Sequence, residues 1–560
     1  MDYDLKIEGG TIIDGSGRAR YRGDVGIRDG TVIALGEARG TARRTIDAGG
    51  LIVAPGFVDI HTHYDAQIFW DPMLSVSPWH GVTSVVVGNC GFGIAPTRAE
   101  HHERIIQSLE KVEGMDAASL RAGLGASWPF ETMAQYLDAI EARGVAVNMG
   151  ALAGHTPLRF YVMGDAAIER EATPAEVARM REVLRESLRA GALGFSTSNG
   201  DFHIGYGGRP VASRYASLEE IRALAGVLTG MPETIFVPHI GKALSVERVV
   251  EIAREIGVNV AWVPLIADLV TVVGEHRKDL ATSNAAAAQG VRISPQISPK
   301  PVMFEYQFKS ALHFEGMDAF RGVSKLDVAG KCTAFLSEAF RVSLLKELEA
   351  MPEPFVLAVK LTTVGEGAEE GAIGKTLAEL GSERGQHPIE VALDLAVRSN
   401  LEARFRMPLG NFRDQETEFL LSDPHTVIGL SDAGAHTGQF CDASMPTFFL
   451  RRWVREMKSV SLERAVHMLT MRPADMYHLR DRGRLAAGFP ADVVLFHEET
   501  VGEGPLRRVA DLPANGSRLV SDALGIHAVI VNGVIIREGN RDTVAQDRKL
   551  PGKVLRRKGG

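Results

Sequence analysis

Cysteine is scarce in this chain. Only three cysteines occur among 560 residues, Cys90, Cys332 and Cys441, too few and too scattered for a disulfide framework. The first residues, MDYDLKIEGG, contain neither the basic nor the apolar segment of a secretory signal. We therefore expect no secretory signal and a reducing, cytoplasmic setting.

Long hydrophobic runs and a strong excess of one charge are also missing. The longest apolar run, at 257–274, is interrupted by Asn259, Pro264 and Asp268, so it does not predict a membrane span. Lys and Arg number 62 against 70 acidic residues, a net charge of −8, with no dense basic face for nucleic acid. The expected partner is a small-molecule substrate, without nucleic acid or membrane, and self-association into a homo-oligomer stays open.

Short strands punctuated by glycine are expected near both ends of the chain. DLKIEGGTIIDGSG and GDVGIRDGTVIALGE alternate with period two between GG and DG pairs, which is typical of antiparallel hairpins. The stretches at 483–496 and 526–539 repeat this texture, with an NG turn in the second. We predict that residues 1–55 and 480–545 form one small β-sandwich domain, followed at 546–560 by a basic tail that is solvated or docked.

Between these ends, apolar runs alternate with amphipathic helical segments, which predicts repeated βα units around a parallel sheet. Thr173 with Glu176, and Ser217 with Glu220, have the spacing of capping boxes at helix starts. Eight units indicate an α/β fold, a TIM-like (β/α)8 barrel over residues 56–479, with catalytic groups at the carboxyl ends of its strands. The predicted strands lie at 56–60, 83–88, 145–152, 192–197, 235–238, 258–265, 291–297 and 426–430.

Residues of about 300–423 exceed what one βα unit needs. We interpret them as an insertion near the barrel mouth, with helices and one extra strand, PFVLAVKL. Its aromatic residues Phe304, Tyr306 and Phe308 could cover an acyl chain as an apolar lid or pack inside the insertion, and the sequence leaves both open.

Metal-ligating side chains fall at the predicted strand ends. His61 and His63 lie two residues apart on the first strand and therefore share a face. Cys90, His239 and Asp432 end the second, fifth and eighth strands. Each alone has a structural explanation as packing, a core histidine or a loop cap. Together, these nitrogen, sulfur and oxygen donors predict one or two metal ions, with Zn²⁺ the first choice and another divalent metal open.

The motifs VAPGFVDIHTH, VIGLSDAGAH and GRLAAGFPADVVLF resemble the amidohydrolase superfamily of metal-dependent hydrolases built on a barrel. HTHYD, GNCGFGIAP, GHTPLR and GALGFSTS resemble its D-aminoacylase, or N-acyl-D-amino-acid deacylase, group. The resemblance covers essentially the whole chain. It implies an amidohydrolase acting on carbon–nitrogen bonds other than peptide bonds.

One absence and one substitution bear on the metal ligands that this resemblance implies. No lysine occurs at 112–241, so the carboxylated lysine that bridges two metals in many superfamily members is excluded, and Cys90 matches the cysteine that D-aminoacylases present instead. A bound metal favours a thiolate over a thiol. The sixth strand reads VNVAWVPLIAD where the group carries a histidine, which leaves the number of metals open. The candidates to replace that ligand are His155, His203, His276 and Lys242.

The resemblance implies hydrolysis of an amide with metal-bound water as the nucleophile. Asp432 is then expected to act as general base and acid, and His155 to stabilise the oxyanion. Arg159 either orients the substrate or forms a structural ion pair. The other candidates for substrate binding are Tyr206, Arg209, Lys242 and His436.

Four functions compete at this point. The leading one is deacylation of N-acyl-D-amino acids or related amides. The second is opening of a cyclic amide, imide or lactone, which the changed sixth strand favours. The third is a lyase or isomerase reaction on the same barrel, since a fold does not fix the reaction. The fourth, a binding protein without activity, is disfavoured because His61, His63 and Asp432 are all present.

Overall fold

A computed structural model describes residues 1–270, 275–311 and 313–557. Its centre is a curled sheet of eight parallel strands in the order β16-β12-β11-β10-β9-β8-β7-β6. All eight strands predicted from the sequence are present, with ends that differ by a few residues. They are β6 Phe57–Asp59, β7 Val82–Val87, β8 Asn148–Gly154, β9 Gly194–Ser198, β10 Ile235–His239, β11 Asn259–Trp262, β12 Ile293–Ile297 and β16 Val427–Ile428.

The first and last strands of this sheet approach each other just beyond their carboxyl ends. Thr62 and Ala433 form a parallel bridge, and the His63 amide donates to the Ala433 carbonyl at 2.8 Å. The Ser431 hydroxyl donates to Asp59 at 2.6 Å. These contacts bring residues near 62 and 432 together, which is the arrangement that a TIM-like fold requires for a shared site.

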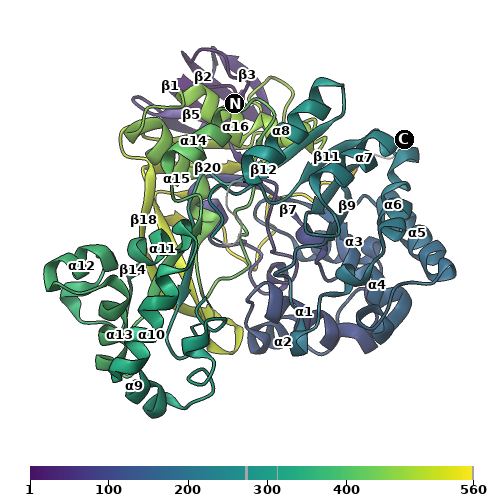
Figure 1. Cartoon of the computed structure of the whole chain (residues 1–560). Helices are drawn as coiled ribbons and strands as arrows, with labels where there is room; N and C mark the ends of the chain where they lie inside the picture. Colours follow the sequence, from purple (N-terminus) through teal and green to yellow (C-terminus); the bar gives the residue numbers. More distant parts are fainter. Residues whose placement is uncertain (271–274, 312, 558–560) are drawn as a thin grey trace.

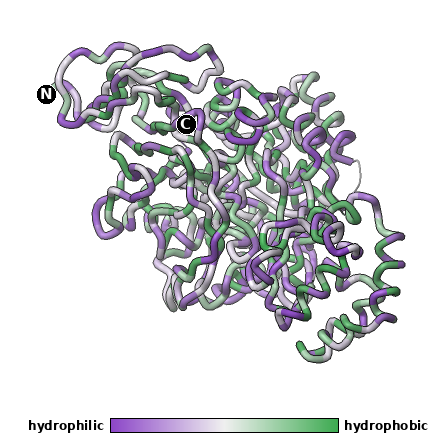
Figure 2. The backbone as a smooth tube through the Cα atoms, turned by 90° about the vertical axis from the view of Figure 1, so that its left-hand side faces the viewer, coloured by the Kyte–Doolittle hydropathy of each residue, from purple (hydrophilic) through white to green (hydrophobic). Residues whose placement is uncertain are grey.

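Helices connect the strands and cover the outside of the sheet (Figure 1). Every residue of β7 is buried, as expected for a parallel strand covered on both faces. Along the outer helices the chain alternates between hydrophilic and hydrophobic residues (Figure 2), the pattern of amphipathic helices. The connecting helices are α1 His102–Val112, α2 Ala117–Leu124, α3 Met133–Arg143, α4 His155–Met163, α5 Pro174–Arg189, α6 Leu218–Ala225, α7 Val246–Ile256 and α8 Glu275–Ala288.

Strands from both chain ends share one nine-stranded sheet, at the top of Figure 1. It has its own cluster of buried aliphatic side chains. The division into domains at 1–55, 480–545 and 56–479 stays a prediction. The strands are β1 Tyr3–Ile12, β2 Tyr21–Arg28, β3 Thr31–Gly36, β4 Ala42–Asp47, β5 Ile52–Pro55, β17 Val493–Phe496, β20 Ile526–Val531, β21 Val534–Glu538 and β22 Arg541–Asp542.

The insertion also buries its own hydrophobic cluster and extends at the lower left of Figure 1. The predicted strand PFVLAVKL is wrong, because this stretch is the helix α11 Glu353–Leu361. Its buried residues Phe355, Ala358 and Val359 have helical spacing, and Pro352 sets its start. The other elements are β13 Val302–Tyr306, β14 Thr363–Val364, β15 Phe405–Gly410, α9 Val328–Leu336, α10 Glu338–Glu349, α12 Leu377–Arg384, α13 Pro388–Arg398 and α14 Asp414–Ser422.

Two further segments complete the chain. A hairpin of β18 Gly502–Leu512 and β19 Gly516–Leu524 separates β17 from β20, and the helices α15 Met445–Phe449, α16 Leu462–Leu469 and α17 Met471–Met476 follow β16. The described part of the basic tail docks along β8, where Val554 bridges Met149 and Leu550 is buried. Residues 558–560 of the predicted tail lie outside the described residues. No described helix combines the length and the apolar character needed to cross a bilayer.

Candidate metal centre

His61 and His63 follow β6 in a fully buried stretch of chain. Their ring centroids lie 5.5 Å apart, and the ligand atoms of His61, His63 and Cys90 all lie within 4.8 Å of one another. The structure therefore brings together the first two strand ends, as the sequence predicts.

Asp432 faces both imidazoles from the end of the last strand. Its Oδ1 lies 3.1 Å from His61 Nε2 and 3.6 Å from His63 Nε2, and Cys90 Sγ lies 3.3 Å from His61 Nε2. Donors that share one tetrahedral Zn²⁺ at about 2.0–2.3 Å are separated by about 3.3–3.7 Å. The spacing and chemistry of this donor set fit a divalent metal ion.

Neighbouring groups orient the imidazoles. His61 Nδ1 donates to Gln296 Oε1 at 2.9 Å, and His239 Nδ1 donates to the Ile240 carbonyl at 2.9 Å. Both hydrogen bonds fix the ring orientation, and with a metal bound they would leave Nε2 as the ligand atom, which is how a metal-binding histidine is usually held. His63 Nδ1 is buried without a hydrogen-bond partner among the described residues.

The backbone and electrostatics of this cluster are also unusual. Cys90 and Asp432 adopt positive φ angles of 52° and 47°, which non-glycine residues rarely do and which concentrate at functional sites. Burial opposes the charged form of Asp432, but the facing His61 and His63 outweigh it and hold the pKa of Asp432 well below its usual range. Burial raises the pKa of the Cys90 thiol, and Glu113 and Asp432 raise it further. Asp432 is therefore a carboxylate at neutral pH.

His203 and His239 lie beside this cluster. Their ring centroids are 4.5 Å apart, both side chains line the same cavity, and His203 Nδ1 is 2.6 Å from the Ser198 hydroxyl. Burial lowers the pKa of His239 to about 4 and lowers that of His203 as well. Both imidazoles are therefore neutral at pH 7 and free of a proton on one nitrogen, the form that binds a metal.

Glu113, which the sequence did not single out, also belongs to this site. Its Oε2 lies 3.5 Å from His63 Nε2 and 4.0 Å from His436 Nε2, with the side chain only 4% exposed. Burial raises its pKa well above the usual range. In the sequence, Glu113 directly follows α1 and is many residues away from the end of any strand of the parallel sheet. A search of the strand ends could therefore not have identified it.

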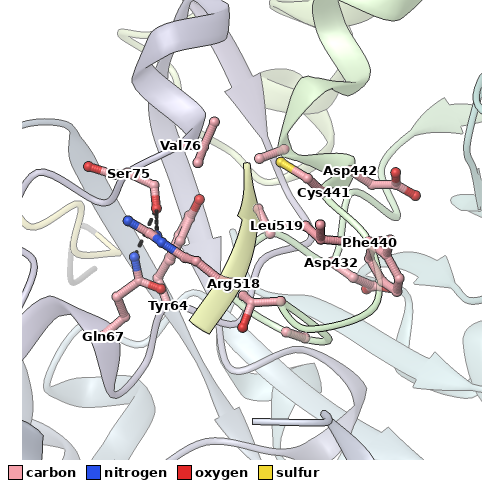
Figure 3. Close-up of a pocket in the computed structure, with 15 residues that line it drawn as sticks. Tyr64, Gln67, Ser75, Val76, Asp432, Phe440, Cys441, Asp442, Arg518 and Leu519 are labelled. Carbon is pink, nitrogen blue, oxygen red and sulfur yellow. Dashed lines mark hydrogen bonds between the residues drawn. The ribbon is translucent and has the colours of Figure 1, made fainter. Parts of the chain in front are cut away.

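The side chains of the metal-site candidates line one large cavity of about 1220 Å³, and they are His61, His63, Cys90, Glu113, His203, His239 and Asp432. It is lined by the strand-end residues, the start of α2, and side chains of the insertion. A smaller hollow, which Asp432 also lines, holds Arg518, whose guanidinium points toward Ser75 and Gln67 (Figure 3). Arg518 Nη1 donates to the Ser75 carbonyl at 2.7 Å.

The family model described as "Amidohydrolase family" matches residues 44–537. The chain belongs to the amidohydrolase family. Over 99% of its length it is 31% identical to N-acyl-D-glutamate deacylase of Alcaligenes xylosoxydans xylosoxydans, covering 96% of that protein. It is 28% identical to D-aminoacylase of the same organism, over 95% of this chain and 94% of that one.

A solved structure of N-acyl-D-glutamate deacylase from Bordetella bronchiseptica is similar over 100% of both chains. It has 28% identity and a TM-score of 0.66, and contains zinc and a phosphonate inhibitor that mimics the tetrahedral intermediate. This likeness supports a TIM-like amidohydrolase fold and a divalent metal in the present amidohydrolase.

Not every residue predicted for the site reaches the cavity of this amidohydrolase. His155 starts α4 directly after β8, but its Nδ1 lies 2.8 Å from the Thr197 hydroxyl and its Nε2 lies 2.9 Å from Glu220 Oε1. Arg159 is also buried and pairs with Glu220 at 2.5 Å. Neither lines the cavity. Both ring nitrogens of His155 are engaged outside it, which argues against the oxyanion role. Arg159 forms a buried ion pair with Glu220, as the structural alternative predicts.

The other candidates divide in the same way. His436 lines the cavity, whereas Tyr206, Arg209 and Lys242 do not and are exposed. His276 binds Glu416 at 2.9 Å outside the cavity. Of the four proposed replacements for the sixth-strand histidine, only His203 lies in the cavity. Phe304 lines the cavity, while Tyr306 and Phe308 pack inside the insertion.

Proposed function

We propose that this amidohydrolase hydrolyses the amide bond of N-acyl-D-amino acids or related amides, with Zn²⁺ as its metal. The observation that carries the proposal is the cluster of His61, His63, Cys90 and Asp432 at one rim of the sheet, facing a large cavity. The similarity to N-acyl-D-glutamate deacylase and D-aminoacylase supports the reaction class.

His61, His63 and Cys90 would hold the cation together with Asp432, and His239 with His203 would contribute to any second ion. A bound divalent cation lowers the pKa of a water molecule to near 7 and polarises the scissile carbonyl. Asp432 is ionised and faces the cavity, with its side chain 32% exposed. It accepts the proton of the attacking water and donates it to the leaving nitrogen.

The test is acid release by zinc-loaded protein from matched N-acyl-D- and N-acyl-L-amino acids and their neutral carboxamides, with and without a chelator. The proposal predicts turnover of D-configured substrates that the chelator abolishes and added Zn²⁺ restores. Hydantoins, cyclic imides and lactones are assayed in parallel. Turnover of these cyclic compounds alone would favour the ring-opening function. Absence of metal-dependent hydrolysis of any substrate would show that the proposal is wrong.

A further inference from the structure

The wall of the cavity away from the strand ends is almost entirely apolar. The insertion contributes side chains from β13, α11 and β15, and the loop after β11 contributes more. The apolar side chains of this wall include Ile266, Leu269, Val270, Phe304, Phe355 and Leu409.

Basic side chains are almost absent from the described cavity lining. Among the lining residues that the structure describes, Lys111 is the one Lys or Arg. Its side chain is 47% exposed and lies 4.0 Å from Glu110. Residues 271–274 and 312, which the structure does not describe, contain no Lys or Arg.

Basic residues just outside the cavity are already paired. Lys300 Nζ lies 2.6 Å from the lining carboxylate of Asp442. Arg518 donates to Asp511 at 2.8 Å and points away from Asp432 (Figure 3). The ammonium of Lys300 and the guanidinium of Arg518 are therefore both engaged and do not receive a substrate carboxylate.

The lining contains more acidic than basic side chains. Five lining residues are acidic: Glu110, Glu113, Asp116, Asp432 and Asp442. Burial lowers the pKa of His313, on the insertion side of the cavity, to about 4, so this imidazole is neutral at pH 7.

A substrate carboxylate placed against this apolar wall would lose hydration without a cationic side chain on the wall to compensate for it, which is unfavourable. We infer that the cavity selects amides whose amine portion is uncharged and bulky, and that it discriminates against free carboxylates, including the side-chain carboxylate of N-acyl-D-glutamate. This inference rests on the proposed function and, within it, favours the related amides over the free N-acyl-D-amino acids.

The test compares four substrates on zinc-loaded, full-length protein: N-acetyl-D-phenylalaninamide, N-acetyl-D-phenylalanine, N-acetyl-D-glutamate and N-acetyl-2-phenylethylamine. The expected kcat/KM is at least about tenfold higher for the neutral carboxamide than for the matching free acid, and lowest for N-acetyl-D-glutamate. A preference for either free acid over the neutral compounds would overturn the inference. It would leave the proposed function intact, which fails only if none of the four is hydrolysed in a metal-dependent manner.

A cation introduced into the wall provides the reciprocal test. Leu409 lies on β15, lines the cavity and is half-buried. Leu409→Arg is expected to raise kcat/KM for the free acid relative to the carboxamide about tenfold, because a hydrogen bond between charged groups is worth more than about 1.4 kcal/mol. Leu409→Gln, similar in length but uncharged, is the matched control and is expected to leave this ratio unchanged. An equal change in both variants would contradict the charge argument, and the comparison of wild-type substrates is decisive if Leu409→Arg does not fold.

Discussion

The buried pair of Arg159 and Glu220 gives a sharp prediction about stability. The Arg159 side chain is 0% exposed and that of Glu220 is 1% exposed. Glu220 accepts from Arg159 and from His155, while the other end of the guanidinium donates to the Arg170 carbonyl at 2.8 Å. Glu220→Gln removes the only carboxylate that the described structure places against this buried cation.

Breaking one partner of a buried ion pair costs about 3–5 kcal/mol, because the remaining charge is left without compensation. We expect Glu220→Gln to lower the free energy of unfolding of the protein by about this amount in urea titrations at pH 7.5. The matched control is Glu219→Gln at the exposed neighbouring position, which is expected to change it by less than about 0.5 kcal/mol.

The same variant separates a structural from a catalytic role. If Arg159 only stabilises the fold, Glu220→Gln assayed at low temperature keeps the KM of the folded enzyme near that of the wild type. A variant as stable as the wild type, or a stable variant with a greatly raised KM, would refute the structural interpretation.

Three further predictions concern the site and its surroundings. Cys90→Ala is expected to lose bound metal in elemental analysis, whereas Cys332→Ala in the insertion keeps it; equal metal contents would mean that the thiol is only packing. Asp432→Asn is expected to lower kcat by about 10²- to 10⁴-fold, measured in protein whose metal content has been checked, and full turnover would exclude the proton transfer. Burial lowers the pKa of His80 to about 3, so this histidine stays neutral when folded but takes up a proton below about pH 6.5 when unfolded, and stability is lost as the pH falls through that value. His80 contributes about 2 kcal/mol to the loss of stability between pH 7.5 and 5, and His80→Gln should reduce the loss by this amount; an unchanged pH dependence of the urea midpoint would contradict this assignment.

The eight strands of the curled parallel sheet could be predicted because each is a short apolar run with clear boundaries, and buried parallel strands require such runs. The proximity of His61, Cys90 and Asp432 could be predicted for the same reason, since these residues directly end or follow those runs. The failure at α11 has a local cause: valine and phenylalanine favour strands, but the spacing of the buried positions is helical.

The remainder of the site depends on contacts between distant segments. Glu113 and His203 enter the cavity from loops, and their positions follow from packing that no local pattern encodes. Glu220 has the spacing of a capping box with Ser217, and the Ser217 hydroxyl does cap the helix. The Glu220 carboxylate does not complete the capping box. It accepts from the buried donors Arg159 and His155 instead of from the backbone amide of Ser217.

The most direct measurement is an anomalous difference map from crystals of the zinc-loaded protein, collected on both sides of the zinc absorption edge. The account predicts a peak within about 2.0–2.3 Å of His61 Nε2, His63 Nε2 and Cys90 Sγ, in contact with Asp432. Zinc-loaded crystals with no peak there, or with Cys90 Sγ turned away from the ion, would contradict it.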